Sequence, residues 1–168
     1  MCNNTNAEKK VLITGASGGI GRAIAIAASQ AGYEIIAHYN NGKDKVESLK
    51  TEIEQKGGKC SLLQFNIADR NDCNNKLEKW TEENGALWGI ILNAGICHDN
   101  AFPALSDDNW DSVIHTNLDG FYNVLKPLVM PLCRKKKGRI ITVSGGATKG
   151  TDEWIVGEAD RVVPDDSW

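Results

Sequence analysis

The sequence predicts an α/β protein built on a doubly wound parallel sheet, and two observations carry this prediction. Short apolar runs alternate with helical patterns through residue 143, and a glycine-rich turn at residues 14–21 follows the first run. Strands that alternate with helices form parallel sheets with helices on both faces. The chain has 168 residues, which is enough for one domain with a sizeable core.

Five apolar runs have the length and β-branched content of strands that are covered on both faces. They lie at residues 11–13, 34–38, 61–67, 88–92 and 139–143. We expect the strand order 3-2-1-4-5, with a ligand crevice above the carboxyl ends of strands 1 and 4. The expected architecture is a Rossmann-type doubly wound parallel sheet, truncated after strand 5.

Four stripes of apolar residues at helical spacing lie between these runs and are expected to face the sheet. They are Ile20, Ala23, Ile24, Ala27 and Ala31; Val46, Leu49 and Ile53; Cys73, Leu77 and Trp80; and Trp110, Ile114, Leu118, Phe121, Leu125, Leu128 and Leu132. Ser106 is a plausible N-cap before the last stripe. Pro127 and Pro131 lie within that stripe and should kink or shorten its helix.

The turn after the first strand has glycines at positions 15, 18, 19 and 21. Glycine lets the backbone turn sharply and approach a ligand without interference from a Cβ atom. The helix that follows directs its free N–H groups and positive dipole end at the turn, which favours a phosphate. A strand, glycine-rich turn and helix at the start of an α/β chain indicate a dinucleotide pyrophosphate site, although such turns also serve as plain connections.

Charge and composition exclude several classes of partner. The net charge of −3 gives no reason to expect binding to nucleic acid or to an anionic membrane. The basic run at residues 134–137 follows a helical pattern, so it either complements the helix dipole or contacts an acidic partner.

Cysteine usage and hydropathy indicate a compartment. The five cysteines are scattered, with no C-x-x-C pair, which argues against a disulfide framework and against a zinc or other metal site. No apolar run approaches the roughly 20 residues that span a bilayer, and the polar N-terminus lacks a signal-peptide core. A cytoplasmic protein without membrane partners is expected, with a disordered segment at residues 1–8.

Polar residues follow the predicted strands at places where packing does not require them. They are Asn66-Ile67, Asn93-Ala94-Gly95 and Ser144-Gly145, with Asn117 in the long helix. Together with the turn Thr14–Gly21, these motifs resemble the short-chain dehydrogenase/reductase family, most closely its β-ketoacyl-acyl carrier protein (3-oxoacyl-ACP) reductase branch. The resemblance covers residues 9 to about 145. It divides the chain into a dinucleotide-binding domain at 9–146 and an irregular acidic tail at 147–168.

The resemblance implies a role for each matching residue. The pyrophosphate and adjoining ribose would be held by Gly15, Ser17, Gly19, Ile20 and Gly21; adenine would be flanked by Asn66 and Ile67; and the nicotinamide-side ribose would lie near Asn93, Ala94 and Gly95. Asn117 and Ser144 would be catalytic, with Asn117 ordering a water chain. The alternatives are turn formation by Asn93 and Ser144, and a helix-to-strand hydrogen bond from Asn117. The family's serine usually stands at the position of Gly145.

The end of the second strand favours NADP(H) over NAD(H). NAD-binding proteins usually place a carboxylate there to hold the ribose 2′-hydroxyl. Residues 38–43 contain no acid that would repel a 2′-phosphate. Lys43 is either a partner for that phosphate or a solvated surface lysine.

The family reduces carbonyls with hydride from the nicotinamide, using a tyrosine and a lysine four residues later. Tyrosines occur here only at positions 33, 39 and 122, and the family's usual spacing from the serine region lands near Glu158 and Val162. A proton donor near pKa 10 needs that neighbouring positive charge. The catalytic tyrosine and lysine are therefore absent after Ser144.

Three functional hypotheses follow. The first is an NADP-dependent oxidoreductase of fatty acid biosynthesis, acting on a 3-oxoacyl thioester or similar carbonyl, either small-molecule or carrier-bound, and inactive as this truncated chain. The second is a non-catalytic dinucleotide-binding module. The third is a truncated product without function, prone to aggregation because strand 5 becomes an uncovered edge. The resemblance also implies a homo-oligomer.

Overall fold

The structure, a computed structural model, describes residues 9–98, 101–144 and 161–162. Several sequence expectations concern residues outside these ranges. They are the disordered segment 1–8, the serine-equivalent position Gly145, the position Glu158, and the acidic tail 147–168 apart from Arg161–Val162.

Among the described residues, the strands form one sheet in the order β3-β2-β1-β4-β5-β6. Strands β1 to β5 are parallel to their neighbours, which confirms the predicted order of the first five. Their bounds are β1 Lys10–Ile13, β2 Glu34–Tyr39, β3 Cys60–Gln64, β4 Gly89–Leu92 and β5 Arg139–Thr142. The carboxyl ends of β1 and β4 therefore lie side by side, as a site at this edge requires.

The sixth strand is a difference from the expected five-stranded sheet. β6, Arg161–Val162, pairs antiparallel with Ile140 and Ile141 of β5. The outer edge of β5 presents unpaired N–H and C=O groups, and a passing segment satisfies them by adding a strand. The edge expected to be uncovered is thus paired over these two residues.

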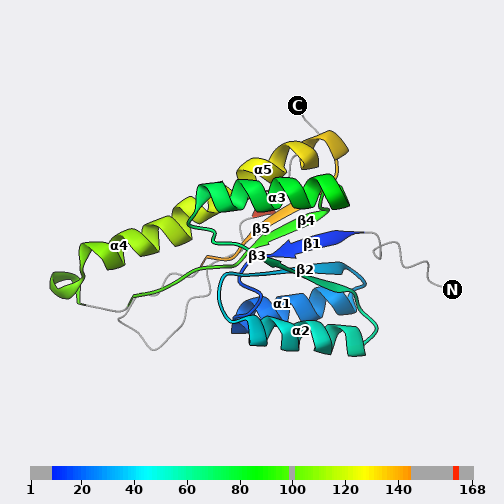
Figure 1. Ribbon diagram of the computed structural model, residues 1–168, viewed down its shortest axis with the longest axis horizontal. Helices are drawn as coiled ribbons and strands as arrows, with labels where there is room; N and C mark the ends of the chain where they lie inside the picture. The colour runs from blue at the N-terminus through cyan, green and yellow to red at the C-terminus, as the bar shows by residue number, and fades with distance from the viewer. Residues whose placement is uncertain (1–8, 99–100, 145–160, 163–168) are drawn as a thin grey trace.

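Helices lie on both faces of the sheet. Figure 1 shows α1 (Gly19–Gln30) and α2 (Lys43–Gln55) on one face, and α3 (Arg70–Asn84) and α5 (Gly120–Lys135) on the other. Between β4 and α5 lie a 3-10 turn, a short helix and a π-helical turn: η1 (Phe102–Ala104), α4 (Asp107–Ile114) and η2 (His115–Asp119). α4 extends beyond the edge at which the strands end.

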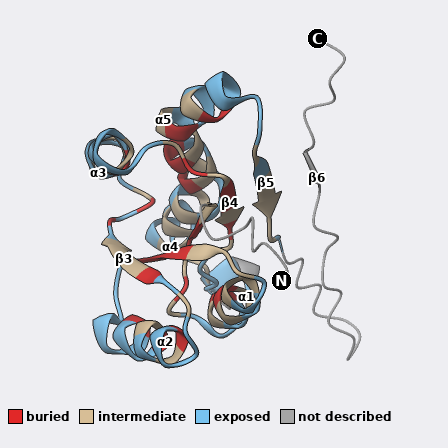
Figure 2. Cartoon of the chain, turned by 90° about the vertical axis from the view of Figure 1, so that its right-hand side faces the viewer, coloured by how far each residue is buried: buried red, intermediate tan, exposed pale blue. Residues whose placement is uncertain are grey.

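Each face of the sheet has its own apolar core, because successive strand residues point to opposite sides. Leu12 packs toward α3 and α5, whereas Val11 and Ile13 pack toward α1 and α2. Figure 2 shows the buried residues concentrated on the strands and on the helix faces turned toward them. Two predicted stripes are confirmed as core: Val46, Leu49 and Ile53 of α2, and Cys73 and Leu77 of α3 with Trp80 partly buried.

The first predicted stripe was wrong about which side of α1 faces the sheet. The buried residues are Gly21 and Ala25, whereas Ala23 and Ala27 are exposed and Ile20 is 64% exposed. The face is set by the close approach of the Gly21 backbone to the turn before it, and only a residue without a side chain permits that approach.

The long stripe was correct only in its second half. Leu128 and Leu132 are buried, but Trp110 is 53% and Leu118 is 65% exposed. A π-helical turn inserts extra backbone per turn, so helical spacing counted from Trp110 does not continue past η2.

Three local predictions concern the ends and interior of the helices between residues 106 and 137. Ser106 is the N-cap of α4, and its Oγ accepts the Asn109 N–H at 3.2 Å. Arg134 and Lys135 lie in the last turn of α5, as expected for cations at a negative dipole end. Pro127 and Pro131 do not shorten α5, which continues to Lys135. Burial of Leu128 and Leu132 outweighs the backbone bonds that the prolines remove.

Among the described residues, no helix has the length and apolarity needed to cross a membrane.

Candidate cofactor-binding site

The candidate site lies where β1, β2, β3 and β4 end, at the carboxyl edge of the sheet. Gly15 is at its centre, with φ +65°, a left-handed conformation that favours glycine. A Cβ atom at Gly15 would stand 2.9 Å from the Ala94 Cα. A Cβ atom at Gly21 would overlap the Gly15 carbonyl oxygen and stand 2.7 Å from the Asn93 Nδ2. The β1–α1 turn therefore packs directly on the loop after β4.

Thr14 and Asn93 join these two loops. The buried Thr14 Oγ1 accepts the N–H groups of Asn93 at 2.9 Å and of Ala94 at 3.0 Å. The Asn93 Nδ2 donates to the Thr14 carbonyl at 3.0 Å and to the Gly15 carbonyl at 3.4 Å. Asn93 thus orders the turn through its side chain, and the structure places it, with Ala94, directly against Gly15.

His38 of β2 connects the turn to the end of β3. Its Nδ1 accepts the Gly15 N–H at 3.1 Å, so its Nε2 carries the proton and donates to the Phe65 carbonyl at 2.9 Å. The side chain is 1% exposed. Burial lowers the pKa of His38 from 6.5 to about 4, against smaller opposing effects of the Phe65 bond and the Asp72 charge. The ring is therefore neutral at physiological pH.

The N-terminus of α1 is open toward solvent. Gly18 is the N-cap and has no side chain with which to cap the helix. A Cβ atom at Gly19 would meet no atom within 4 Å, and Ile20 is exposed. The first N–H groups of a helix have no partner within it, so they are available to a ligand. Ser17, Gly18 and Gly19 also line a shallow cavity of about 360 Å³ with Arg22, Asp44, Lys45 and Ser48.

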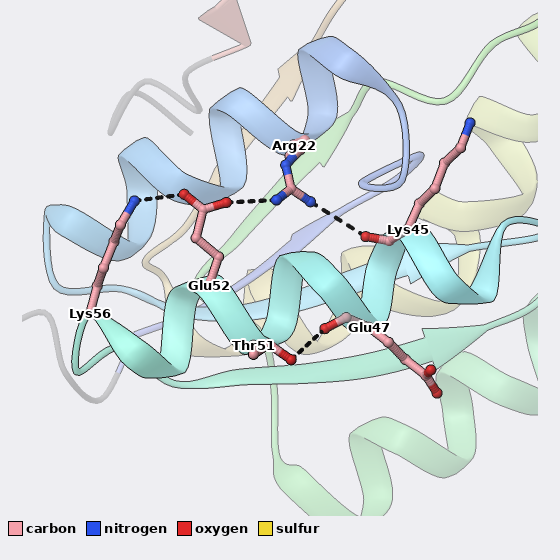
Figure 3. Close-up of polar contacts among 6 residues, drawn as sticks. All are labelled: Arg22, Lys45, Glu47, Thr51, Glu52 and Lys56. Atoms are coloured by element: carbon pink, nitrogen blue, oxygen red, sulfur yellow. Dashed lines mark hydrogen bonds and ion pairs between the residues drawn. The ribbon is translucent and has the colours of Figure 1, made fainter.

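Arg22 forms one wall of this cavity and is held by α2 (Figure 3). Its Nη2 donates to the Glu52 Oε2 at 2.6 Å, and its Nη1 donates to the Lys45 carbonyl at 3.4 Å. The hydrogen bond from Lys56 and the nearby cations lower the pKa of Glu52. Lys45 lines the cavity. Of the two alternatives for Lys43, its surroundings match the solvated surface lysine, because it lies 3.6 Å from Glu47 with its side chain 70% exposed.

Asn66 and Ile67, the predicted adenine residues, form a loop held from two sides. The Asp72 carboxylate accepts the Asn66 N–H at 2.7 Å, and the Asn66 Oδ1 accepts the Ala68 N–H at 3.0 Å. From α5, the buried Asn123 donates to the Ile67 carbonyl at 3.0 Å. Burial raises the pKa of Cys73 to about 12, so its thiol stays protonated beside the Asn66 carbonyl at 3.4 Å.

Asn117 lies in the π-helical turn η2 and clamps the loop after β4. Its Oδ1 accepts the Ile96 N–H at 2.8 Å and its Nδ2 donates to the Ile96 carbonyl at 2.9 Å. Gly95 packs against the same side chain. Ser144 is exposed just beyond β5, where the Val143 N–H donates to the Leu92 carbonyl at 2.8 Å. The ends of β4 and β5 and Asn117 are thereby brought to one edge.

The three tyrosines have other surroundings. Tyr33 stacks on Trp88 with ring centroids 5.0 Å apart, and Tyr39 is buried. Tyr122 is 51% exposed on α5, with the Lys126 Nζ and the Arg70 Cζ each 5.3 Å from its ring centroid. A hydrogen bond from Lys126 lowers the pKa of Tyr122. This pair has the four-residue spacing of the family motif but faces the start of α3.

Four residues that shape the site have no role predicted from the sequence: Thr14, His38, Lys45 and Asn123. Two of them carried a usable signal. His38 ends an apolar run and Asn123 interrupts an apolar stripe, and a buried polar side chain in such a place needs a hydrogen-bond partner.

Comparison with known proteins identifies the protein family to which this chain belongs. A model of the short chain dehydrogenase family matches residues 9–156. The chain therefore belongs to the short-chain dehydrogenase/reductase family. The 3-oxoacyl-[acyl-carrier-protein] reductase FabG of Aggregatibacter actinomycetemcomitans is 45% identical over 138 residues, which cover 82% of this chain and 57% of that protein. FabG of Thermotoga maritima is 34% identical over 136 residues, covering 81% and 55%.

The chain thus spans a little over half the length of these curated relatives. Among solved structures, it is similar to a gluconate 5-dehydrogenase from Burkholderia cenocepacia, crystallised in complex with NADP and tartrate. That likeness has a TM-score of 0.73 and 26% identity, and it covers 80% of this chain and 52% of the other. The Rossmann-type fold and the family resemblance are confirmed.

Gly21→Ala and Gly19→Ala form a matched pair that tests the packing of the turn. Alanine at 21 overlaps the Gly15 carbonyl, whereas alanine at 19 meets no atom within 4 Å. We expect Gly21→Ala to lower the free energy of unfolding by about 3 kcal/mol or more. Gly19→Ala should leave it unchanged or slightly raised. Urea unfolding measures both, and equal effects would contradict the packing described.

The buried His38 makes stability depend on pH. The pKa of His38 is about 4 in the folded chain, and its ordinary value is 6.5. Between these two pH values the unfolded chain therefore binds a proton that the folded chain does not. The contribution of neutral His38 to the free energy of unfolding is complete above pH 6.5 and is lost as pH falls toward 4. We expect a loss of about 2 kcal/mol between pH 6.5 and 5. Urea unfolding of wild type and of His38→Asn at a series of pH values isolates the contribution of His38. If the free energies of unfolding of the two proteins changed in parallel with pH, the buried neutral histidine would not be the cause.

Proposed function

We propose that this chain binds NADP(H) at the carboxyl edge of its sheet. One observation carries the proposal: the turn from Gly15 to Gly21 leaves no room for a Cβ atom at either end, while Gly19 between them faces open space. Such a cradle at an uncapped helix N-terminus fits a pyrophosphate. Membership of a dehydrogenase family and the likeness to a relative solved with NADP support it.

The predicted contacts are proposed with the same residues. The pyrophosphate and its ribose would be held by Gly15, Ser17, Gly19, Ile20 and Gly21; adenine by Asn66 and Ile67; and the nicotinamide-side ribose by Asn93, Ala94 and Gly95. The backbone of the turn would donate N–H groups to the anion. The loops after β3 and β4 would hold the two ends, because hydrogen bonds from Asn123 and Asn117 fix their course.

The proposed preference is for NADP(H) over NAD(H). Arg22 and Lys45 line the cavity beside the turn, and Asp44 is the one carboxylate among its lining residues. Glu52 already pairs with Arg22 at 2.6 Å, but the Arg22 guanidinium and the Lys45 ammonium both border the cavity and would attract a 2′-phosphate. Residues 38–41, where NAD-binding proteins place their acid, contain none.

Gly19→Asp and Gly19→Asn test the proposed site without disturbing the fold. A Cβ atom at 19 meets no protein atom within 4 Å, and an acid suits a helix N-terminus. The aspartate carboxylate would repel the pyrophosphate, so we expect NADPH binding, followed by nicotinamide fluorescence, to weaken about tenfold or more relative to the asparagine variant. Equal affinities for the two variants would remove the site from this turn. Equal or tighter binding of NADH to wild type would remove the preference.

The proposed reaction class is carbonyl reduction, with a 3-oxoacyl thioester of fatty acid biosynthesis as substrate, since the curated relatives are named 3-oxoacyl-[acyl-carrier-protein] reductases. The bound nicotinamide would supply hydride. Ser144, exposed at the end of β5, would donate a hydrogen bond to the carbonyl oxygen. Asn117 would keep the loop beneath the nicotinamide in place and order water beside it.

A non-catalytic dinucleotide-binding module is the second candidate, and the placement of the tyrosines favours it. The alkoxide formed by hydride transfer needs a proton from a group whose pKa is near the working pH. Tyr33 and Tyr39 are occupied in packing, and Tyr122 faces α3. We therefore propose that these 168 residues bind the cofactor without efficient turnover.

The activity of the chain is tested with acetoacetyl thioesters and NADPH at pH 7. We expect turnover at least a hundredfold below 1 s⁻¹, a rate within the ordinary enzyme range, because general acid catalysis contributes about 10²–10⁴-fold. Tyr122→Phe is the control, and it should change nothing. Turnover near 1 s⁻¹ that this variant abolishes would make Tyr122 the acid and contradict the proposal.

Partners and compartment complete the proposal. We propose a cytoplasmic protein, consistent with the reduced thiols of Cys60, Cys73 and Cys133. We also propose self-association through α4 to α5, where Trp110, Leu118 and Met130 expose large apolar side chains.

A further inference from the structure

His38 contacts both loops that the proposed function assigns to the cofactor. Its imidazole accepts the Gly15 N–H and donates to the carbonyl of Phe65, the residue before the proposed adenine loop. Its own carbonyl accepts the Ala16 N–H at 2.9 Å. Two consecutive amides of the glycine turn are therefore bound by one residue of the neighbouring strand.

The imidazole cannot move away from these partners. It is 1% exposed, and its ring lies against the Phe65 ring with centroids 4.0 Å apart. Nδ1 must be unprotonated to accept the Gly15 N–H, which leaves the proton on Nε2 for the Phe65 carbonyl. Asp72, at the start of α3, is the charged group that acts on this ring.

Gly15, which His38 holds, is also hydrogen-bonded to other residues of the site. Its carbonyl accepts the Gly18 N–H at 3.0 Å and the Asn93 Nδ2 at 3.4 Å. The imidazole holds the Thr14–Gly15 peptide, and the His38 carbonyl holds the next peptide, Gly15–Ala16, whose carbonyl accepts from Gly18. The two peptides that meet at the Gly15 Cα thus set where Gly18, the N-cap of α1, lies. If the Nδ1 acceptor is removed, the Gly15 N–H loses its partner, and the turn must rearrange to find another.

We propose that His38 is a positioning residue for the dinucleotide: through its Nδ1 it holds Gly15 so that the N-terminus of α1 faces the pyrophosphate. The inference rests on the proposed function, and it assigns the cofactor effect to the Gly15 bond rather than to the Phe65 bond. A residue that merely filled the core would show no difference between the two bonds.

Two substitutions separate these bonds. The Oδ1 of asparagine is attached to Cγ, as Nδ1 is, so His38→Asn keeps an acceptor for the Gly15 N–H. The Nε2 of glutamine stands one atom further out, so His38→Gln keeps a donor for the Phe65 carbonyl. Each variant leaves a gap against Phe65. Titration calorimetry with NADP⁺ at pH 7 gives the dissociation constants, and thermal melting gives the stability of each variant.

We expect His38→Asn to bind NADP⁺ within about threefold of wild type, and His38→Gln to bind about tenfold more weakly or worse. The difference should exceed what their melting temperatures explain. Equal affinities, or affinities that follow stability alone, would overturn the role of His38 while leaving the proposed function intact. Wild type that fails to bind NADP⁺ would overturn both.

A measurement on the wild-type chain keeps the inference testable if a variant does not fold. Through-hydrogen-bond coupling in nuclear magnetic resonance should connect the Gly15 amide nitrogen with the His38 Nδ1. NADP⁺ should shift both resonances. Unchanged resonances at saturating NADP⁺ would contradict the proposed role.

Discussion

The close approach of two backbones, the β1–α1 turn and the loop after β4, is the constraint on which the rest of this edge depends. Gly15 in a left-handed conformation packs against Ala94, and Gly21 packs against Gly15. Only residues without a Cβ atom allow this approach. It brings buried N–H and C=O groups together, and every one of them needs a partner.

Side chains from the strand ends supply those partners. Thr14 accepts hydrogen bonds from the amides after β4, and the Asn93 side chain donates to the Thr14 carbonyl. His38, at the end of β2, accepts the Gly15 N–H of the same turn. Asn117 and Asn123 act in the same way on the loops after β4 and β3, from one continuous helical segment. Most polar residues near the site therefore bond backbone rather than one another. The protein itself therefore fixes the shape of the candidate site at the carboxyl edge of the sheet. A site of this kind can bind a ligand without a large reorganisation of the protein.

Periodicity sufficed for the strand order and the α2 and α3 core faces, because apolar side chains decide those. It failed for α1, where the backbone contact at Gly21 sets the buried face, and for Trp110 and Leu118, where the π-helical turn breaks the helical spacing. Motif spacing located Asn93, Asn117 and the glycine turn. It could not find His38 or Asn123, whose importance depends on partners 23 to 56 residues away in the sequence. The sequence left the role of Lys43 open and did not single out Lys45, because the orientation of α2 decides which lysine lines the cavity.

The glycine turn, supported by its neighbouring loops, is the proposed binding site of the dinucleotide. Backbone amide chemical shifts during titration with NADP⁺ test this most directly. We expect the largest changes at residues 15–21, with secondary changes at Ile67, Asn93 and Ala94. The contradicting result would be changes centred on the opposite edge, at the cavity lined by Ser29, Gly32 and Gly58, or no localised change at all.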